Sequence, residues 1–92
     1  MIKTFGDKRT EKFWNGQHVK LPTEILRRAM DKLYIIEHAG SLDELRVPPA
    51  NRLEPLSGDR LGQHSIRINQ QWRICFRWDG GNAHDVEITD YH

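Results

Sequence analysis

The sequence predicts an α+β fold in which two N-terminal helices pack on one face of a small antiparallel sheet. Apolar residues recur at helical spacing up to about residue 40, and from residue 51 onward they alternate with polar residues at a period of two. The chain has 92 residues, of which 37% are hydrophobic and 29% charged. That length and composition suit one folded domain with a modest core, so residues 1–92 are expected to form a single domain.

The first half of the chain predicts a short strand and then two helices. Residues 1–5 suit the strand, and residues 6–16 suit a first helix with Asp7 as its N-cap and Gly16 as its stop. Residues 21–40 show the strongest helical pattern, with Pro22 near the start and Gly40 past the end. Its apolar residues at helical spacing are Ile25, Leu26, Ala29, Met30, Leu33 and Ile36. Two helices in succession predict a helical hairpin.

A short helical turn is expected next. Ser41 and Glu44 have the three-residue spacing of a capping box, in which each side chain binds the other residue's backbone N–H. Pro48 and Pro49 then prevent the helix from continuing.

The second half predicts an antiparallel sheet with one apolar face. Residues 64–69 and 72–78 alternate, "DGGN" supplies a turn, and residues 84–92 form the last strand. The apolar face takes Ile66, Ile68, Trp72, Ile74, Phe76, Trp78, Val86 and Ile88, and the helices are expected to cover it. The opposite face takes Arg67, Arg73, Arg77 and Tyr91, and is called here the arginine face.

Charge is segregated along the chain. Residues 46–77 carry six basic residues against two acidic ones, whereas residues 78–92 carry four acidic residues and no Lys or Arg. Every basic residue of the middle block is arginine, whose planar fork of donors suits phosphate, so the block favours phosphate recognition. The alternative is a solvated strand face that pairs with the acidic C-terminal segment.

Several classes of protein are excluded. The apolar runs are too short for a membrane span, and the N-terminus reaches charged residues before any hydrophobic stretch, unlike a signal peptide. Cys75 is the single cysteine, so no internal disulfide forms and no zinc or iron–sulfur spacing exists. A cytoplasmic protein without a metal or cofactor is expected.

The chain ends on three ionisable residues, Asp90, Tyr91 and His92. If the last strand pairs beside residues 72–78, strand alternation places Tyr91 on the arginine face, with Asp90 and His92 on either side of it at the rim. The alternative is a frayed terminus with a solvated histidine.

The segment "NRLEPLSGDRLGQHSIRINQQWRICFRW" followed by "VEITDYH" resembles the HigB branch of the RelE/ParE toxin superfamily. The resemblance covers nearly the whole chain. It implies two helices on an antiparallel sheet and a ribosome-dependent endoribonuclease that cuts mRNA in the decoding site. It also implies a HigA-like antitoxin with a helix-turn-helix, through which alone the system binds its promoter DNA.

The resemblance also implies site residues. Arg73, Asp90, Tyr91 and His92 fall where such toxins keep residues for cleavage, and Arg60 in "GDR" matches a position on the loop that lines the groove. Arg67 and Arg77 would bind RNA from the same face. Nuclease members have "LHPLKG" where this chain has "LEPLSG", so Glu54 and Ser57 replace a histidine and a lysine. His64, nearby in sequence, would substitute for the missing imidazole, although it shares the parity of Ile66 and so is directed toward the core. Glu54 and His64 are therefore expected among the RNA-binding residues, with Arg60, Arg67 and Arg77.

RNA cleavage by a 2′-hydroxyl needs a base, cations for the developing phosphorane charge and an acid for the leaving oxygen. His92 would transfer the proton, Arg73 would stabilise the phosphorane, Tyr91 would stack on or bond to the nucleotide, and Asp90 would orient the histidine or act as the base. Two alternatives stay open: a gyrase-poisoning toxin of the same superfamily, and a catalytically weak RNA- or protein-binding module.

Overall fold

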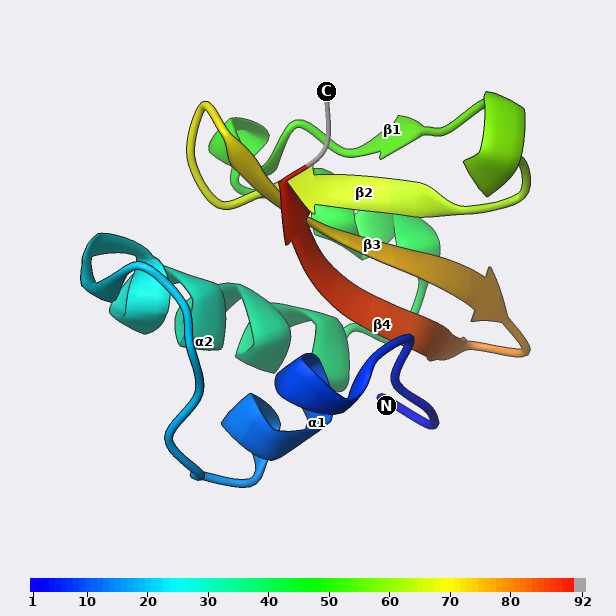
Figure 1. Ribbon diagram of the computed structural model, residues 1–92. Helices are drawn as coiled ribbons and strands as arrows, with labels where there is room; N and C mark the ends of the chain where they lie inside the picture. Colours follow the sequence, from blue (N-terminus) through cyan, green and yellow to red (C-terminus); the bar gives the residue numbers. More distant parts are fainter. Residues whose placement is uncertain (91–92) are drawn as a thin grey trace.

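The computed structural model describes residues 1–90, which form a four-stranded antiparallel sheet with two α-helices on one face (Figure 1). The strands are β1 (Glu54–Pro55), β2 (His64–Arg67), β3 (Trp72–Asp79) and β4 (Asn82–Asp90), and they lie side by side in chain order. The helices are α1 (Lys8–Trp14) and α2 (Thr23–His38), with short 3-10 turns η1 (Leu42–Arg46), η2 (Pro49–Asn51) and η3 (Gly58–Arg60). The predicted fold class is confirmed. None of the helices in this part of the chain is long and apolar enough to cross a membrane.

The N-terminal segment runs parallel to the outer edge of β4. It forms two isolated bridges, Ile2 with Ala83 and Phe5 with Val86, so the predicted strand of residues 1–5 is present only as these pairings. A side chain at Gly6 would meet the Asp85 carbonyl oxygen at 2.9 Å, which explains the glycine at this close approach.

Both helices begin and end where the local signals predict. The Asp7 carboxylate accepts a hydrogen bond from the Thr10 backbone N–H at 3.0 Å and so caps α1. Gly16, at φ 85°, follows its end. In α2 the buried stripe is Ile25, Ala29, Leu33 and Ile36, while Leu26 and Met30 are half-buried at its margin. The rings of Trp14 and Tyr34, 5.3 Å apart, join the two helices.

The capping box predicted at residues 41–44 is wrong. The Ser41 hydroxyl lies 3.4 Å from the Glu44 carboxylate and makes no bond to the backbone, and the segment forms the 3-10 turn η1. The proline pair directly after η1 leaves room for little more than one turn, too short for an α-helix to propagate. Buried Asn51, at the end of η2, donates to the carbonyls of Leu45 and Val47 and so ties the two turns together.

The predicted apolar face of the sheet forms the core. Ile66, Ile74, Phe76, Val86 and Ile88 are fully buried against the helices, and Trp72 and Trp78 pack at the edges of this cluster. The "DGGN" turn is confirmed, with Asp79 opposite Asn82 and both glycines at positive φ.

Two features of the sheet lie outside the sequence prediction. Strand β1 pairs with β2, so the segment before η3 belongs to the sheet and not to a loop. In β4 a bulge lies between the pairs Cys75–Glu87 and Arg77–His84, and Asp85 adopts a left-handed backbone at φ 55°. The bulge lets Ala83 and Val86, three residues apart, both face the core.

Candidate active site

The arginine face is built over a buried floor. Ser65 and Cys75 point to this face by strand parity, yet both are fully buried because the side chains of Arg60, Arg73 and Glu87 and the segment around β1 cover them. Burial raises the pKa of the Cys75 thiol, which favours its protonated form.

Arg73 lies at the centre of the site and is held on three sides. Its Nε donates to the Ser65 hydroxyl at 2.7 Å, and its Nη2 donates to the Arg52 carbonyl at 2.9 Å. The same Nη2 lies 3.3 Å from a Glu54 carboxylate oxygen on β1. The Arg73 side chain is therefore only 13% exposed. It neither stacks on Trp72, which contacts Arg9 instead, nor pairs with Glu87.

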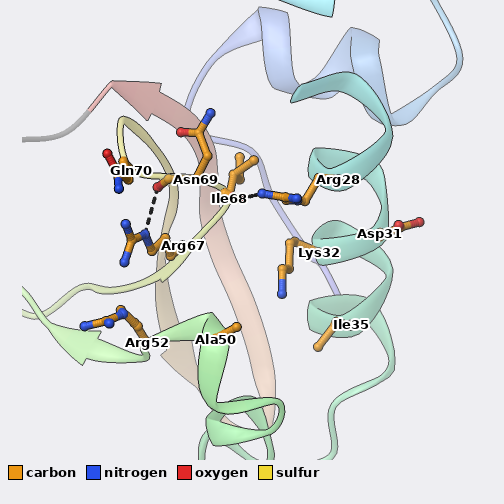
Figure 2. Close-up of a pocket in the computed structure, with 10 residues that line it drawn as sticks. All are labelled: Arg28, Asp31, Lys32, Ile35, Ala50, Arg52, Arg67, Ile68, Asn69 and Gln70. Carbon is orange, nitrogen blue, oxygen red and sulfur yellow. Dashed lines mark hydrogen bonds between the residues drawn. The ribbon is translucent and has the colours of Figure 1, made fainter. Parts of the chain in front are cut away.

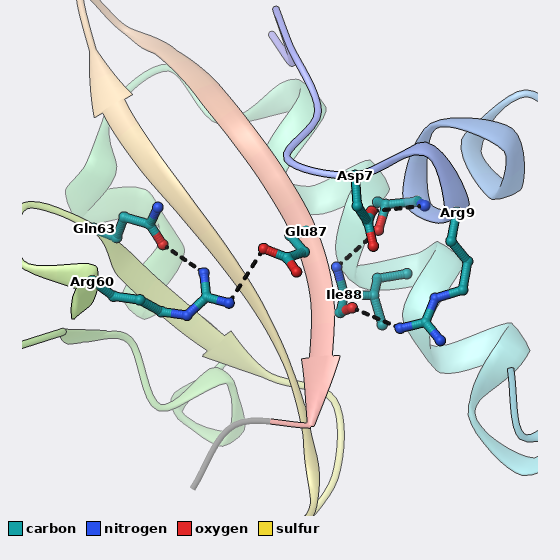
Figure 3. A network of polar contacts seen from close by, with 7 residues as sticks. Asp7, Arg9, Arg60, Gln63, Glu87 and Ile88 are labelled. Carbon is teal, nitrogen blue, oxygen red and sulfur yellow. Dashed lines mark hydrogen bonds and ion pairs between the residues drawn. The ribbon is translucent and has the colours of Figure 1, made fainter.

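Arg60 and Glu87 form a second ion pair beside Arg73. The Arg60 Nη2 lies 3.2 Å from a Glu87 carboxylate oxygen, and its Nη1 donates to Gln63 at 3.1 Å. Figure 3 shows the Arg60 side chain reaching from η3 across to Glu87 on β4. This contact links the loop before β2 to the last strand.

The register brings the last strand to Arg73. Thr89 is the cross-strand partner of Arg73, and Asp90 is opposite Trp72 and accepts a hydrogen bond from the Gln71 amide at 2.9 Å. Arg67 is the partner of Arg73 on the other side, in β2. The structure thus brings Glu54, Arg60 and Arg67 to the region of Arg73. Asp90 lies at the same end of the sheet, but as the partner of Trp72 it shares the opposite face from Arg73. Tyr91 and His92 lie outside the described residues.

Two residues predicted for the site lie elsewhere. Arg77 is four residues along β3, about 13 Å at ordinary strand rise, and pairs with Asp85 at 3.5 Å near the β3–β4 turn. His64 faces the core side of the sheet, as its parity with Ile66 predicts. Its ring stacks on that of Phe76, with 6.5 Å between the ring centroids. The structure brings neither side chain to Arg73.

Of the three partners that hold Arg73, the sequence indicated Glu54 but gave no signal for Ser65 or the Arg52 carbonyl. Ser65 is an ordinary polar position of an alternating strand. The Arg52 carbonyl that accepts from Arg73 belongs to a residue with a left-handed backbone at φ 47°, a conformation that an arginine in the sequence does not predict. Glu87 has strand parity with the arginine face, which is a signal that could have paired it with Arg60. Among residues 1–90, His, Cys, Asp and Glu side chains do not gather in a group that could hold a metal ion.

The arrangement of helices on one face of an antiparallel sheet is shared by a solved protein structure. It matches a chain in the YoeB–YefM complex from Staphylococcus aureus with a TM-score of 0.57, over 100% of this chain and 98% of that chain. The sequence identity is 15%, so this likeness concerns the fold alone.

Sequence comparison then gives the family. The family model described as "RelE-like toxin of type II toxin-antitoxin system HigB" matches residues 3–92. Toxin HigB-1 of Vibrio cholerae is 39% identical over 85 residues, 90% of each chain. Endoribonuclease HigB of Proteus vulgaris is 36% identical over 93 residues and covers both chains fully. The chain therefore belongs to the HigB-like toxins of type II toxin–antitoxin systems, and its partner is an antitoxin.

Proposed function

We propose that this toxin is an endoribonuclease that cuts mRNA held in the decoding site of the ribosome. The relative from Proteus vulgaris, which matches over its full length, is named for endoribonuclease activity. In the proposed reaction the 2′-hydroxyl attacks the adjacent phosphorus, its proton passes to a base, and the 5′-oxygen leaves with a proton from an acid. The products are a 2′,3′-cyclic phosphate and a 5′-hydroxyl.

The observation that carries the proposal is the way Arg73 is held. Two neutral acceptors, the Ser65 hydroxyl and the Arg52 carbonyl, fix the guanidinium, and the Glu54 carboxylate that also pairs with it is 52% exposed and so able to give way to a ligand. Its Nη1 group donates to no acceptor among residues 1–90, so two of its five N–H donors are available to a ligand. A prepositioned cation of this kind stabilises charge that develops on the phosphorane, since little reorganisation is needed during the reaction.

The position of the last strand supports the remaining roles in the proposal. Asp90 lies one residue past the partner of Arg73, and the chain continues from there into Tyr91 and His92. In the proposal His92 transfers the proton, Tyr91 contacts the nucleotide, and Asp90 orients His92 or takes the 2′-hydroxyl proton. Arg60 and Arg67 attract the RNA backbone, and Glu54 holds Arg73 until RNA binds.

The finer partners belong to the same proposal. The antitoxin is HigA-like and carries a helix-turn-helix, so promoter DNA is bound through the antitoxin and not by the toxin. The toxin acts in the cytoplasm, where ribosomes and mRNA are found.

Expression of the chain without its antitoxin tests the proposal. We expect growth arrest and a loss of intact mRNA, measured by northern blot, because the ribosome presents transcripts to the arginine face. Growth arrest with intact mRNA and broken or relaxed DNA would instead identify a gyrase poison. Growth arrest with both intact would leave a binding module that does not cleave.

A further inference from the structure

A cationic hollow lies beside the candidate active site, between α2 and the loop that joins β2 to β3. Its volume is about 640 Å³. Four cations line it, namely Arg28 and Lys32 from α2, Arg52 from the end of η2 and Arg67 from β2. The one carboxylate in the lining, that of Asp31, points away from the β2–β3 loop in Figure 2. The hollow therefore has a large excess of positive charge.

Neutral groups orient these cations. The Arg28 Nη1 donates to the Ile68 carbonyl at 3.2 Å, and the Arg67 Nε donates to the Asn69 carbonyl at 3.0 Å (Figure 2). Lys32 donates to the side-chain oxygen of Asn51, which is itself buried. Within residues 1–90 no carboxylate forms an ion pair with Arg28, Lys32 or Arg67. These bonds fix the side chains and leave their charges uncompensated.

Lys32 is the most buried of the four cations that line the hollow. It lies at the base of the hollow and is only 9% exposed. Burial lowers the pKa of its ammonium, and the positive charge of Arg28, one helical turn away, lowers that pKa further, while the Asp31 carboxylate opposes both and leaves the pKa below its ordinary value. A buried cation without a close ion pair is costly, and an anion between Lys32 and the guanidinium groups would offset that cost.

The hollow is continuous with the candidate active site. Arg67 is the cross-strand partner of Arg73, and strands lie about 4.8 Å apart. The Arg52 carbonyl accepts a hydrogen bond from Arg73, while the Arg52 side chain lines the hollow. A ligand with regularly spaced negative charges would therefore meet both sites at once.

We propose that this hollow is a phosphate-binding subsite that holds a backbone phosphate of the RNA next to the phosphate that is cleaved. Three guanidinium groups favour phosphate, which they bind with paired N–H donors. The volume also admits the attached ribose. The inference deepens the proposed function and depends on it for the identity of the ligand.

The test is equilibrium binding of a short, fluorescently labelled single-stranded RNA with 2′-O-methyl groups, measured by anisotropy over a range of salt concentrations. We expect Arg28→Gln to weaken binding roughly 5- to 20-fold and to reduce the slope of log K against log salt by about 0.7, the value for one lost phosphate contact on a single strand. Arg28→Lys should keep most of the salt slope because it keeps the charge.

Arg27→Gln is the matched control, because it removes the same charge as Arg28→Gln. Arg27 is exposed, neighbours Arg28 on α2 and does not line the hollow. It should bind within about twofold of the natural chain. Equal losses for the two variants would reduce the effect to overall charge and overturn the subsite. Unchanged RNA binding by Arg28→Gln would also overturn the subsite. If that variant kept its RNA binding and bound the antitoxin more weakly, the hollow would be assigned to an acidic segment of the antitoxin.

The methylated RNA cannot be cut, so this binding experiment does not depend on catalysis. A chain that binds RNA through the hollow but leaves mRNA intact on the ribosome would keep the subsite and overturn the proposed function.

Discussion

Glu54 lies next to Arg73 at the centre of the candidate active site, where a phosphate would have to bind. The Glu54 side chain is 52% exposed, and the Arg73 side chain is 13% exposed. The carboxylate can therefore move into solvent while the guanidinium stays in place. The carboxylate places a negative charge beside Arg73, where it competes with RNA for the same cation.

Replacing Glu54 with glutamine removes that competition. We expect Glu54→Gln to bind the methylated RNA up to about fivefold more tightly, the range for losing a partly exposed ion pair. Glu11→Gln, an exposed carboxylate on α1, serves as the control for overall charge. Weaker RNA binding by Glu54→Gln would contradict this account and would mean that the carboxylate is needed to position Arg73.

Lys32 gives a test of stability against pH. Because its pKa is lowered in the folded chain, the unfolded chain binds more protons between that pKa and the ordinary value of 10.5. The contribution of Lys32 to the free energy of unfolding therefore rises as the pH increases through this range. We expect Lys32→Met to lack this rise, measured by urea denaturation at a series of alkaline pH values. Parallel pH profiles for the two proteins would contradict it.

Cys75 titrates in the same alkaline region with the opposite sign. Its pKa is raised in the folded chain, so its contribution is present below its ordinary pKa and is lost as the pH increases. The natural chain and Lys32→Met both retain Cys75, so the difference between their profiles of stability against pH reports the contribution of Lys32 alone.

At the scale of elements, α1 fixes the end of β4 that carries Asp90. The Thr10 hydroxyl accepts a hydrogen bond from the Ile88 N–H at 2.9 Å, and the Arg9 Nη2 donates to the Ile88 carbonyl at 3.2 Å. Figure 3 shows this contact between Arg9 and β4 on the helix side of the strand. Thr10 and Arg9 thus bond to the Ile88 backbone as a neighbouring strand would, at the point where the N-terminal segment leaves the edge of β4 and α1 begins.

Thr10→Val tests this contact with nearly the same side-chain shape. The substitution leaves the buried Ile88 N–H without an acceptor, so we expect a loss of about 1–3 kcal/mol in the free energy of unfolding. Hydrogen exchange at the Ile88 amide should speed up in the valine variant and stay slow in Thr10→Ser, which keeps the hydroxyl. Equal exchange in the two variants would show that Thr10 does not hold β4.

The long elements could be predicted from sequence because their signals repeat. The buried stripe of α2 extends over several turns, and the alternation in β3 extends over several residue pairs. Both patterns predicted the element that the structure contains. Strand β1 has two residues, too few for a period, and it forms because β2 offers it an edge. The bulge at Asp85 arises from the pairing of β4 with β3, and no local sequence pattern predicts it.

At the scale of the whole molecule, the site could be predicted only in part. Strand parity correctly placed Arg67 and Arg73 on one face. Parity says nothing about distance along a strand, so it also grouped Arg77 with them, although Arg77 lies at the far end of β3. The hollow is lined by residues of α2, η2 and β2, three elements that are separated in the sequence. Only the tertiary fold brings Arg28 to the same hollow as Arg67.

The central claim is that Arg73 stabilises the transition state of mRNA cleavage by a 2′-hydroxyl. The direct test is the single-turnover cleavage rate of mRNA on programmed ribosomes for the natural chain, Arg73→Ala and the control Arg46→Ala, whose side chain lies in η1 and pairs with Asp43. Thermal melts of the free proteins establish that each variant folds.

We expect the natural chain and Arg46→Ala to cleave at similar rates, and to leave a 2′,3′-cyclic phosphate and a 5′-hydroxyl at the cut. Arg73→Ala should be slower by on the order of 10²-fold or more, the usual effect of removing one such donor. A folded Arg73→Ala that cleaves as fast as the natural chain, or ends that carry a 3′-hydroxyl and a 5′-phosphate, would contradict the account.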